Sequence, residues 1–100
     1  MRLELTGRHV DITPALRRLV DRKIAKLERL LNDRALSAQA VLTTQRHQHR
    51  ADITLHARGE QMFHGVGAKT TWATSLSEAV GKIVHQADKA KGKLQARKRR

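Results

Sequence analysis

Positively charged side chains recur at helical spacing in two segments of this 100-residue sequence. They are Arg18, Arg22, Lys26 and Arg29 in the first segment and Lys82, His85, Lys89 and Lys93, with the polar Gln86, in the second. Because a helix turns once every 3.6 residues, each set lies along one side of its helix. Lysine and arginine on rigid elements are suited to binding the phosphates of a nucleic acid. The sequence therefore predicts two basic stripes that bind a phosphate backbone.

The overall charge of the chain favours the same class of partner. There are 21 Lys and Arg against 9 Asp and Glu, which gives a formal net charge of +12. Self-repulsion of this size destabilises a compact chain unless an anionic partner neutralises it. One Trp, one Phe and no Tyr leave few aromatic groups for insertion into a membrane or for base stacking. A structured nucleic acid, bound through its shape and phosphates, is the expected partner.

The size and composition indicate one small domain. One hundred residues are enough for a single modest core. The chain has no cysteine, which excludes disulfides and thiolate metal sites. No apolar stretch approaches the roughly 20 residues that span a bilayer. We expect a cytoplasmic protein without a membrane partner.

Hydrophobic patterning predicts the element order β-α-β-β-β-α. The expected strands are residues 2–6, 37–45, 50–57 and 61–67, and the expected helices are residues 14–31 and 70–94. Thr13 is a good N-cap for the first helix, and Pro14 suits its first position. Each helix has one apolar stripe, so both must pack on the same face of a four-stranded sheet. The fold class is an α+β two-layer sandwich over residues 1–94, followed by a frayed, basic tail at 95–100.

The expected core combines apolar positions of both helices with alternate residues of the strands. The helix positions are Leu16, Leu19, Val20, Ile24, Leu27, Leu30 and Leu31, then Leu76, Val80, Ile83, Ala87, Ala90 and Leu94. In the strand at 61–67, Gly65 and Gly67 indicate a bulge or the close approach of another element. Trp72, at the start of the second helix, is interpreted as a lid on the core in preference to a base-stacking group.

Four segments and one spacing carry a resemblance to a known family. They are LTG at 5–7, ITPALR at 12–17, KIAKLER at 23–29 and ADITLH at 51–56, with Lys82, Gln86 and Lys89 in the last helix. Over about residues 1–94 the sequence resembles the short form of the ribosome hibernation promoting factors, also called ribosome-associated inhibitors or ribosomal subunit interface proteins. The resemblance implies a fold similar to double-stranded RNA-binding domains, which agrees with the predicted element order.

The resemblance also implies a function without catalysis or a cofactor. Members of the family bind the small ribosomal subunit where mRNA and tRNA would lie, and they silence translation in stressed or stationary cells. Together with Arg22 from the first basic stripe, the family's rRNA-contacting positions give the expected RNA-binding set: Arg22, Lys23, Lys26, Arg29, Lys82, His85, Lys89 and Lys93. The implied partner is the small subunit and its rRNA, with no small-molecule substrate, and the protein is expected to be monomeric off the ribosome.

Three features depart from the family's pattern. The second helix usually opens with an acidic patch and Met-Tyr, whereas Trp72 and Ala73 stand here, with Ser77 and Gly81 at the inner acidic positions. The sequence shows no C-terminal dimerisation domain. It also shows no acidic tail of the kind found in members that prevent ribosome dimerisation.

Other interpretations of the same residues stay open. The basic stripes can be solvated helix faces, and Lys23, beside the core stripe, can pack its stem and keep its ammonium in water. The alternative function is a general double-stranded RNA-binding regulator or chaperone acting off the ribosome. A third possibility, from another class, is a module that binds an acidic protein.

The histidines and carboxylates give no sign of a metal site or a catalytic centre. Two histidines, His47 and His49, cannot complete a zinc site, and neither a cysteine nor a suitable carboxylate accompanies them. His56 and His64 fall on nearby strands and are interpreted as polar surface residues. If these histidines faced RNA, protonation near their reference pKa of about 6.5 would strengthen binding as the pH falls.

Overall fold

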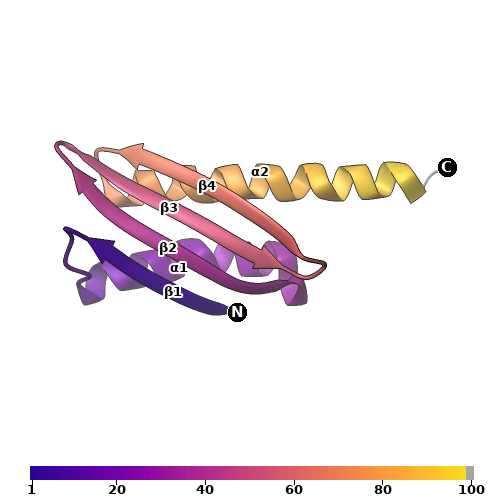
Figure 1. Ribbon diagram of the computed structural model, residues 1–100, viewed down its shortest axis with the longest axis horizontal. Coiled ribbons are helices and arrows are strands. Elements are labelled where there is room, and N and C mark those ends of the chain that lie inside the picture. Colours follow the sequence, from indigo (N-terminus) through magenta and orange to yellow (C-terminus); the bar gives the residue numbers. More distant parts are fainter. Residues whose placement is uncertain (99–100) are drawn as a thin grey trace.

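Four strands and two long helices, in the order β-α-β-β-β-α, make up the computed structural model of this protein (Figure 1). The strands are β1 (Arg2–Arg8), β2 (Ala35–Gln45), β3 (Gln48–Ala57) and β4 (Gln61–Lys69); the helices are α1 (Pro14–Leu31) and α2 (Trp72–Lys98), with a 3-10 turn at Asn32–Arg34. The structure describes the backbone of residues 1–98 and the side chains of residues 1–32 and 34–90. The predicted element order and α+β fold class are confirmed.

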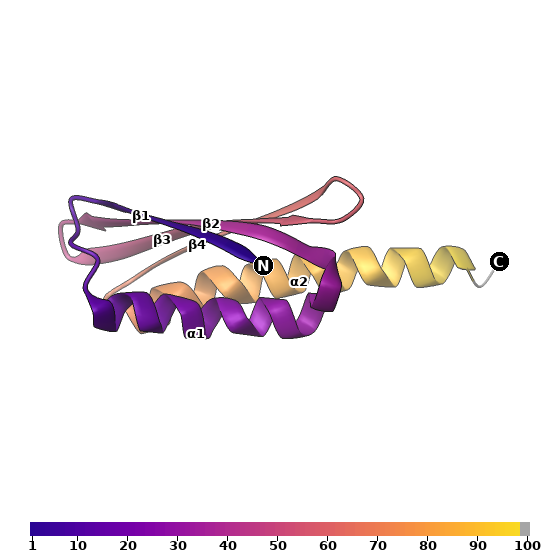
Figure 2. The ribbon, with the colours of Figure 1, turned by 90° about the horizontal axis from the view of Figure 1, so that it is seen from below.

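The four strands follow one another across a single sheet in the order β1-β2-β3-β4. β1 pairs with β2 in parallel, and β2, β3 and β4 form an antiparallel meander. Both helices lie under the same face of the sheet and run in the same direction, while the opposite face is open (Figure 2). α2 continues past the end of the sheet (Figure 1). This layering follows from the single apolar stripe of each helix.

The start of α1 is set by local chemistry, as the sequence predicts. The Thr13 hydroxyl accepts a hydrogen bond from the Leu16 backbone amide at 3.2 Å, and Pro14 occupies the first helical position. An N-cap satisfies one of the amides that the first turn leaves unpaired. The stripe that α1 buries consists of Leu16, Val20, Ile24, Leu27 and Leu31.

Leu30 is the one expected α1 core residue that lies in solvent, with 43% of its surface exposed. At 100° per residue it stands about 80° from the centre of the buried stripe, so it falls beside the core instead of over it. Leu19, on the same flank, is partly buried because Ala73 of α2 lies across the groove from it. The prediction of Leu30 as a core residue was wrong because periodicity does not say which flank a neighbouring helix covers.

The two glycines of β4 mark the closest approach between the sheet and α2. A Cβ built on Gly67 would lie 1.9 Å from the carbonyl oxygen of Ser75, and one on Gly65 would lie 2.3 Å from that of Ala79. The pairing of β3 with β4 continues through both glycines without a shift of register. Of the two expectations for these glycines, close approach is therefore the correct one.

Ser75, the one fully buried polar residue among those described, fixes the first turn of α2. Its hydroxyl lies 2.5 Å from the His49 carbonyl and 2.8 Å from the Thr71 carbonyl, and it accepts a hydrogen bond from the Lys69 amide at 2.9 Å. Trp72 packs against the core and stacks on the His49 ring, with 4.5 Å between ring centroids. This contact supports the interpretation of Trp72 as a lid.

Most elements are longer than the sequence pattern predicts. Compared with the predicted bounds, β1 extends to Arg8, β2 begins at Ala35, β3 begins at Gln48, β4 extends to Lys69 and α2 extends to Lys98. The helix α2 begins at Trp72, two residues later than predicted. Backbone pairing extends strands through polar residues: Gln45 pairs with Gln48 across a two-residue turn. The backbone of α2 includes residues 95–98, but the side chains from residue 91 and all of 99–100 lie outside the described residues, so the frayed tail stays a prediction.

Glu78 joins α2 to the end of β4. Its carboxylate accepts a hydrogen bond from the Ala68 amide at 3.1 Å and lies 3.2 Å from the Lys69 ammonium. The amide bond first, and then the contact with Lys69, lower the pKa of Glu78 below that of an ordinary glutamate.

Substituting Gly67→Ala should lower the free energy of unfolding, by about 1–3 kcal/mol, because the new Cβ overlaps the Ser75 carbonyl. The matched control is Gly81→Ala, at an exposed α2 position where a Cβ would meet nothing within 4 Å. The control should raise the free energy of unfolding by about 0.5–1 kcal/mol, since alanine favours a helix. Urea denaturation measures both, and equal effects of the two substitutions would contradict the close approach.

The lowered pKa of Glu78 predicts a pH dependence of stability. A carboxylate whose pKa is depressed by folding stabilises the native state above its unfolded pKa of about 4.3, and this stabilisation is lost as the pH falls through the folded value. The difference in free energy of unfolding between the protein and Glu78→Gln should therefore be largest near neutral pH and shrink in acid. Denaturation at a series of pH values tests this, and a difference that grows in acid would refute it.

Candidate nucleic-acid interface

The α1 part of the predicted interface is an exposed, cationic helix face. Arg22, Lys26 and Arg29 are exposed, and Lys23 is half-buried beside the core residue Ile24. Among the described residues, none of these four cations forms an ion pair with a carboxylate. Their positive charge is therefore available to an external anion.

The carboxylate closest in sequence to the middle of this face is engaged elsewhere. Glu28 lies 3.6 Å from the amino group of Met1, which comes from the beginning of β1. This pairing brings Met1 to the last turns of α1. The sequence indicates that α1 has few carboxylates, but only the fold reveals that one of them pairs with the amino group of Met1.

A groove between α1 and the first turn of α2 brings several predicted residues together. It is lined by Leu19, Arg22, Lys23, Lys26 and Ala73. Three cations and two apolar side chains thus border one depression, with no carboxylate among them. This position is compatible with both interpretations of Lys23, because its stem can be half-buried while its ammonium borders the groove.

The α2 part of the interface is divided by the fold. His85 and Lys89 are exposed and form no ion pair within the part of the chain that is described. Lys93 lies outside the residues whose side chains are described. The ammonium of Lys82, in contrast, donates a hydrogen bond to the Val66 carbonyl at 2.7 Å. Lys82 and Lys89 are both exposed, and of the two only Lys82 has a hydrogen bond to β4 among the described residues.

Gln86 is a polar residue of the same stripe that contacts the sheet twice. Its side-chain amide donates to the His64 carbonyl at 2.6 Å and accepts from the His64 backbone amide at 3.1 Å. Sequence reasoning placed Gln86 with the cations because it shares their spacing. A signal for its actual contact was present in the glycines of β4, which indicated that another element comes close.

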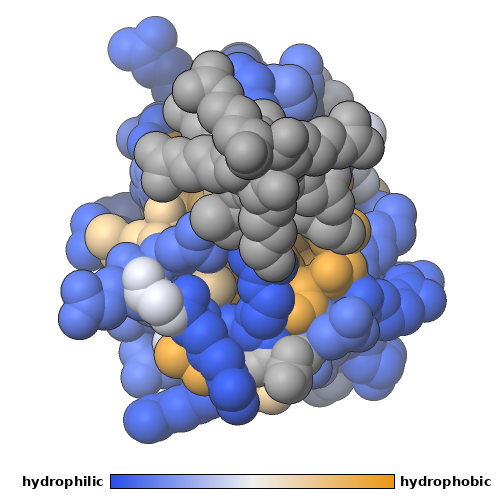
Figure 3. Space-filling model, turned by 90° about the vertical axis from the view of Figure 1, so that its right-hand side faces the viewer, coloured by the Kyte–Doolittle hydropathy of each residue, from blue (hydrophilic) through white to orange (hydrophobic). Residues whose placement is uncertain are grey.

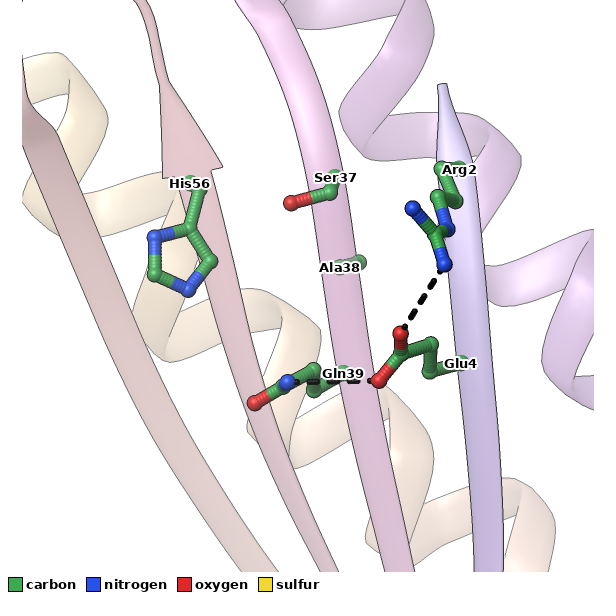
Figure 4. A pocket seen from close by; sticks show the side chains of 6 residues that line it. All are labelled: Arg2, Glu4, Ser37, Ala38, Gln39 and His56. Carbon is green, nitrogen blue, oxygen red and sulfur yellow. Dashed lines mark hydrogen bonds and ion pairs between the residues drawn. The ribbon is translucent and has the colours of Figure 1, made fainter.

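The open face of the sheet has a different electrostatic character. Arg2 pairs with Glu4 at 3.5 Å, and Glu4 accepts a hydrogen bond from Gln39 at 3.3 Å, beside a shallow pocket that His56 also lines (Figure 4). Asp52 similarly lies 3.8 Å from the Arg50 guanidinium and 2.6 Å from the His64 ring. Arg2 and Arg50 of this face are thus paired with carboxylates, in contrast to the cations of the helix face.

The histidines are distributed over both faces. His49 lies under Trp72 on the helix side, whereas His56 and His64 alternate with the buried residues of their strands and so belong to the open face. The side chains of His56 and His64 therefore lie on the face of the sheet opposite the helices. Among the residues whose side chains the structure describes, 1–32 and 34–90, no group of three or more His, Asp or Glu is arranged to hold a metal ion.

The surface at the end toward which α2 extends is mostly hydrophilic where it is coloured, with small hydrophobic areas between hydrophilic side chains (Figure 3). Neither helix has, in the part that the structure describes, an apolar stretch of the length that a membrane crossing requires.

Comparisons with known proteins identify relatives over nearly the whole chain. Residues 3–95 match the family described as Sigma 54 modulation protein / S30EA ribosomal protein. The chain is 35% identical over 94 residues to a protein of Escherichia coli (strain K12) named ribosome hibernation promoting factor, covering 94% of this chain and 97% of the relative. A protein of the same name from Azotobacter vinelandii is 36% identical over 62 residues, or 62% of this chain and 57% of the relative.

Solved structures have the same fold. The Protein Y N-terminal domain of Thermus thermophilus superposes with a TM-score of 0.76 and 26% identity, covering 86% of this chain and 94% of that domain. A ribosomal subunit interface protein from Coxiella burnetii gives a TM-score of 0.80 at 20% identity, covering 92% and 99%, and supports the fold alone. The resemblance inferred from the sequence is confirmed: this chain belongs to the Sigma 54 modulation protein / S30EA ribosomal protein family, which includes the ribosome hibernation promoting factors.

Proposed function

We propose that this protein is a cytoplasmic ribosome hibernation factor that binds small-subunit rRNA in the channel used by mRNA and tRNA. The observation that carries the proposal is the face formed by α1 and α2, where cations without carboxylate partners stand on two helices packed on one sheet. Relatives named ribosome hibernation promoting factor, at 35% identity over 94% of the chain, direct the choice of partner to the ribosome.

The proposed mechanism is steric occlusion without catalysis or a cofactor. The sheet holds both helices, so the long side chains start from fixed positions and lose less freedom when they meet fixed phosphates. Arg22, Lys23, Lys26 and Arg29 supply the contacts from α1. Lys82, His85 and Lys89 supply them from α2, with Lys93 farther along. A bound protein in the channel then excludes mRNA and tRNA by mass action.

The electrostatic part of the proposal has a measurable signature. Each phosphate that a protein neutralises releases counterions, so log affinity falls linearly with log salt, by about 0.9 per phosphate for a duplex. About six phosphate contacts would give a slope near −5. The open sheet face, where charges are paired, should contribute little to this slope.

Reversing three charges of the helix face, in the variant Lys26→Glu/Arg29→Glu/Lys89→Glu, should weaken binding to small subunits by about 100-fold or more. The matched control, Arg8→Glu/Arg46→Glu/Arg58→Glu, changes the net charge equally at exposed positions of β1 and the turns. Equilibrium binding to labelled subunits measures both, and circular dichroism checks the fold. An equal loss of affinity in the two variants would mean that only the net charge of the protein matters, and it would contradict the proposal.

Competition separates the ribosomal function from the alternative of a general double-stranded RNA-binding regulator. A protein in the mRNA/tRNA channel should be displaced from small subunits by mRNA together with initiator tRNA, because they occupy the same space. Free duplex RNA should compete poorly. Displacement by duplex RNA but not by mRNA and tRNA would support the alternative function instead.

A further inference from the structure

Between the two helices lies a groove that combines apolar walls with a cationic rim. We call it the α1–α2 groove; it is lined by Leu19, Arg22, Lys23 and Lys26 of α1 and by Ala73 of α2. Its volume is about 460 Å³, within the range of sites that enclose a small organic ligand. The phosphate contacts of the proposed function need only the cations, so they leave the hollow itself without a role.

The depth of each α1 side chain in the groove follows from its angle around the helix axis. At 100° per residue, Lys23 and Leu19 stand about 60° and 100° from the centre of the buried stripe. Lys26 and Arg22 stand farther round, at about 120° and 160°. The first two are half-buried and the last two are exposed. The floor of the groove is therefore formed by Leu19 and the apolar stem of Lys23, and its rim is cationic.

The α2 wall of the groove is open because its residue is small. Ala73 is exposed and carries only a methyl group, although it directly follows Trp72, the bulky first residue of the helix. Trp72 packs on the core and stacks on the His49 ring instead of lining the groove. The first turn of α2 also contains no acidic residue. Among the described residues, then, neither a bulky side chain nor a carboxylate of α2 lines the groove.

This combination of walls and rim suits a single nucleotide. A base taken out of its stack can lie between apolar side chains, while the phosphate attached to it requires cations nearby. Arg22 and Lys26, one turn apart on the rim, form no ion pair with any of the described carboxylates. The hollow beside the turn at residues 45–48 has only polar and charged side chains among those described, so it offers a base no apolar wall.

We propose that the α1–α2 groove holds one unpaired nucleotide of the bound RNA, with its base between Leu19 and Ala73 and its phosphate at Arg22 and Lys26. This inference rests on the proposed function and adds to it a site for a base. Bases inside a duplex are stacked and paired, so only an unpaired or looped-out nucleotide can enter. The groove thus gives a physical reason for the poor competition expected of free duplex RNA.

The first test uses the free protein and two small probes, adenosine monophosphate and ribose 5-phosphate, which share a phosphate and differ in the base. An NMR titration follows the methyl signals of Leu19 and Ala73. Adenosine monophosphate should shift both signals and bind about 10-fold more tightly than ribose 5-phosphate, because its base buries apolar surface in the groove. Equal affinities of the two probes would overturn the proposal.

The second test fills the groove with the substitution Ala73→Leu, which leaves the charge unchanged. This variant should lose the preference for adenosine monophosphate and keep its affinity for ribose 5-phosphate. Its affinity for small subunits should fall about 10-fold, while the slope of log affinity against log salt stays the same because no cation is removed. The matched control, Ala25→Leu, makes the same change on α1 outside the groove and should alter neither property. Circular dichroism checks the fold of both variants.

The outcomes separate this proposal from the proposed function. Lost binding of adenosine monophosphate with unchanged subunit affinity in Ala73→Leu would make a free nucleotide the ligand, and would overturn the assignment to RNA. Equal losses of subunit affinity in Ala73→Leu and Ala25→Leu would also overturn it. A wild-type salt slope near zero would reject the proposed function itself, whereas the titration of the free protein does not depend on the ribosome.

Discussion

The close approach of α2 to β4 is the constraint on which the rest of this structure depends. Gly65 and Gly67 leave room for the carbonyls of Ala79 and Ser75, and no other residue would allow that distance. The approach buries Leu76, Ala79 and Ile83 against the sheet and brings polar side chains within reach of the strand edge. The two glycines therefore account both for the close packing of α2 on the sheet and for the hydrogen bonds that α2 makes to the edge of β4.

The net charge of the candidate interface depends on which groups the carboxylates pair with. Glu28 is paired with the chain terminus, Glu78 with Lys69 and the Ala68 amide, and Asp52 with groups on the open face. Each of these pairs is at least partly exposed and contributes modestly to stability. Among the described residues, none of these carboxylates pairs with Arg22, Lys23, Lys26, Arg29 or Lys89. The charge of these cations is therefore available to an external anion.

Much of the fold could be predicted because the local signals agree with one another. The Thr13 cap, the alternation of residues 51–57 and the single stripe of each helix all predict one two-layer arrangement. The errors share a physical cause. Leu30 was assigned to the core from its angle alone. Element ends were placed where hydrophobicity stops, although backbone pairing continues through residues such as Gln48 and His49.

The candidate site shows the same division between sequence and tertiary structure. Residue type and periodicity determined by themselves that both helices carry cations on one side, and they predicted an anionic partner. Tertiary structure alone decided that Lys82, exposed like Lys89, also donates a hydrogen bond to the Val66 carbonyl. The reason is geometric: a helical period fixes the angle of a side chain around its axis, but not what lies opposite at each height. The contacts of α2 with β4 lie between His64 and Lys69. Lys82 stands opposite this part of the strand, and Lys89 stands farther along the helix.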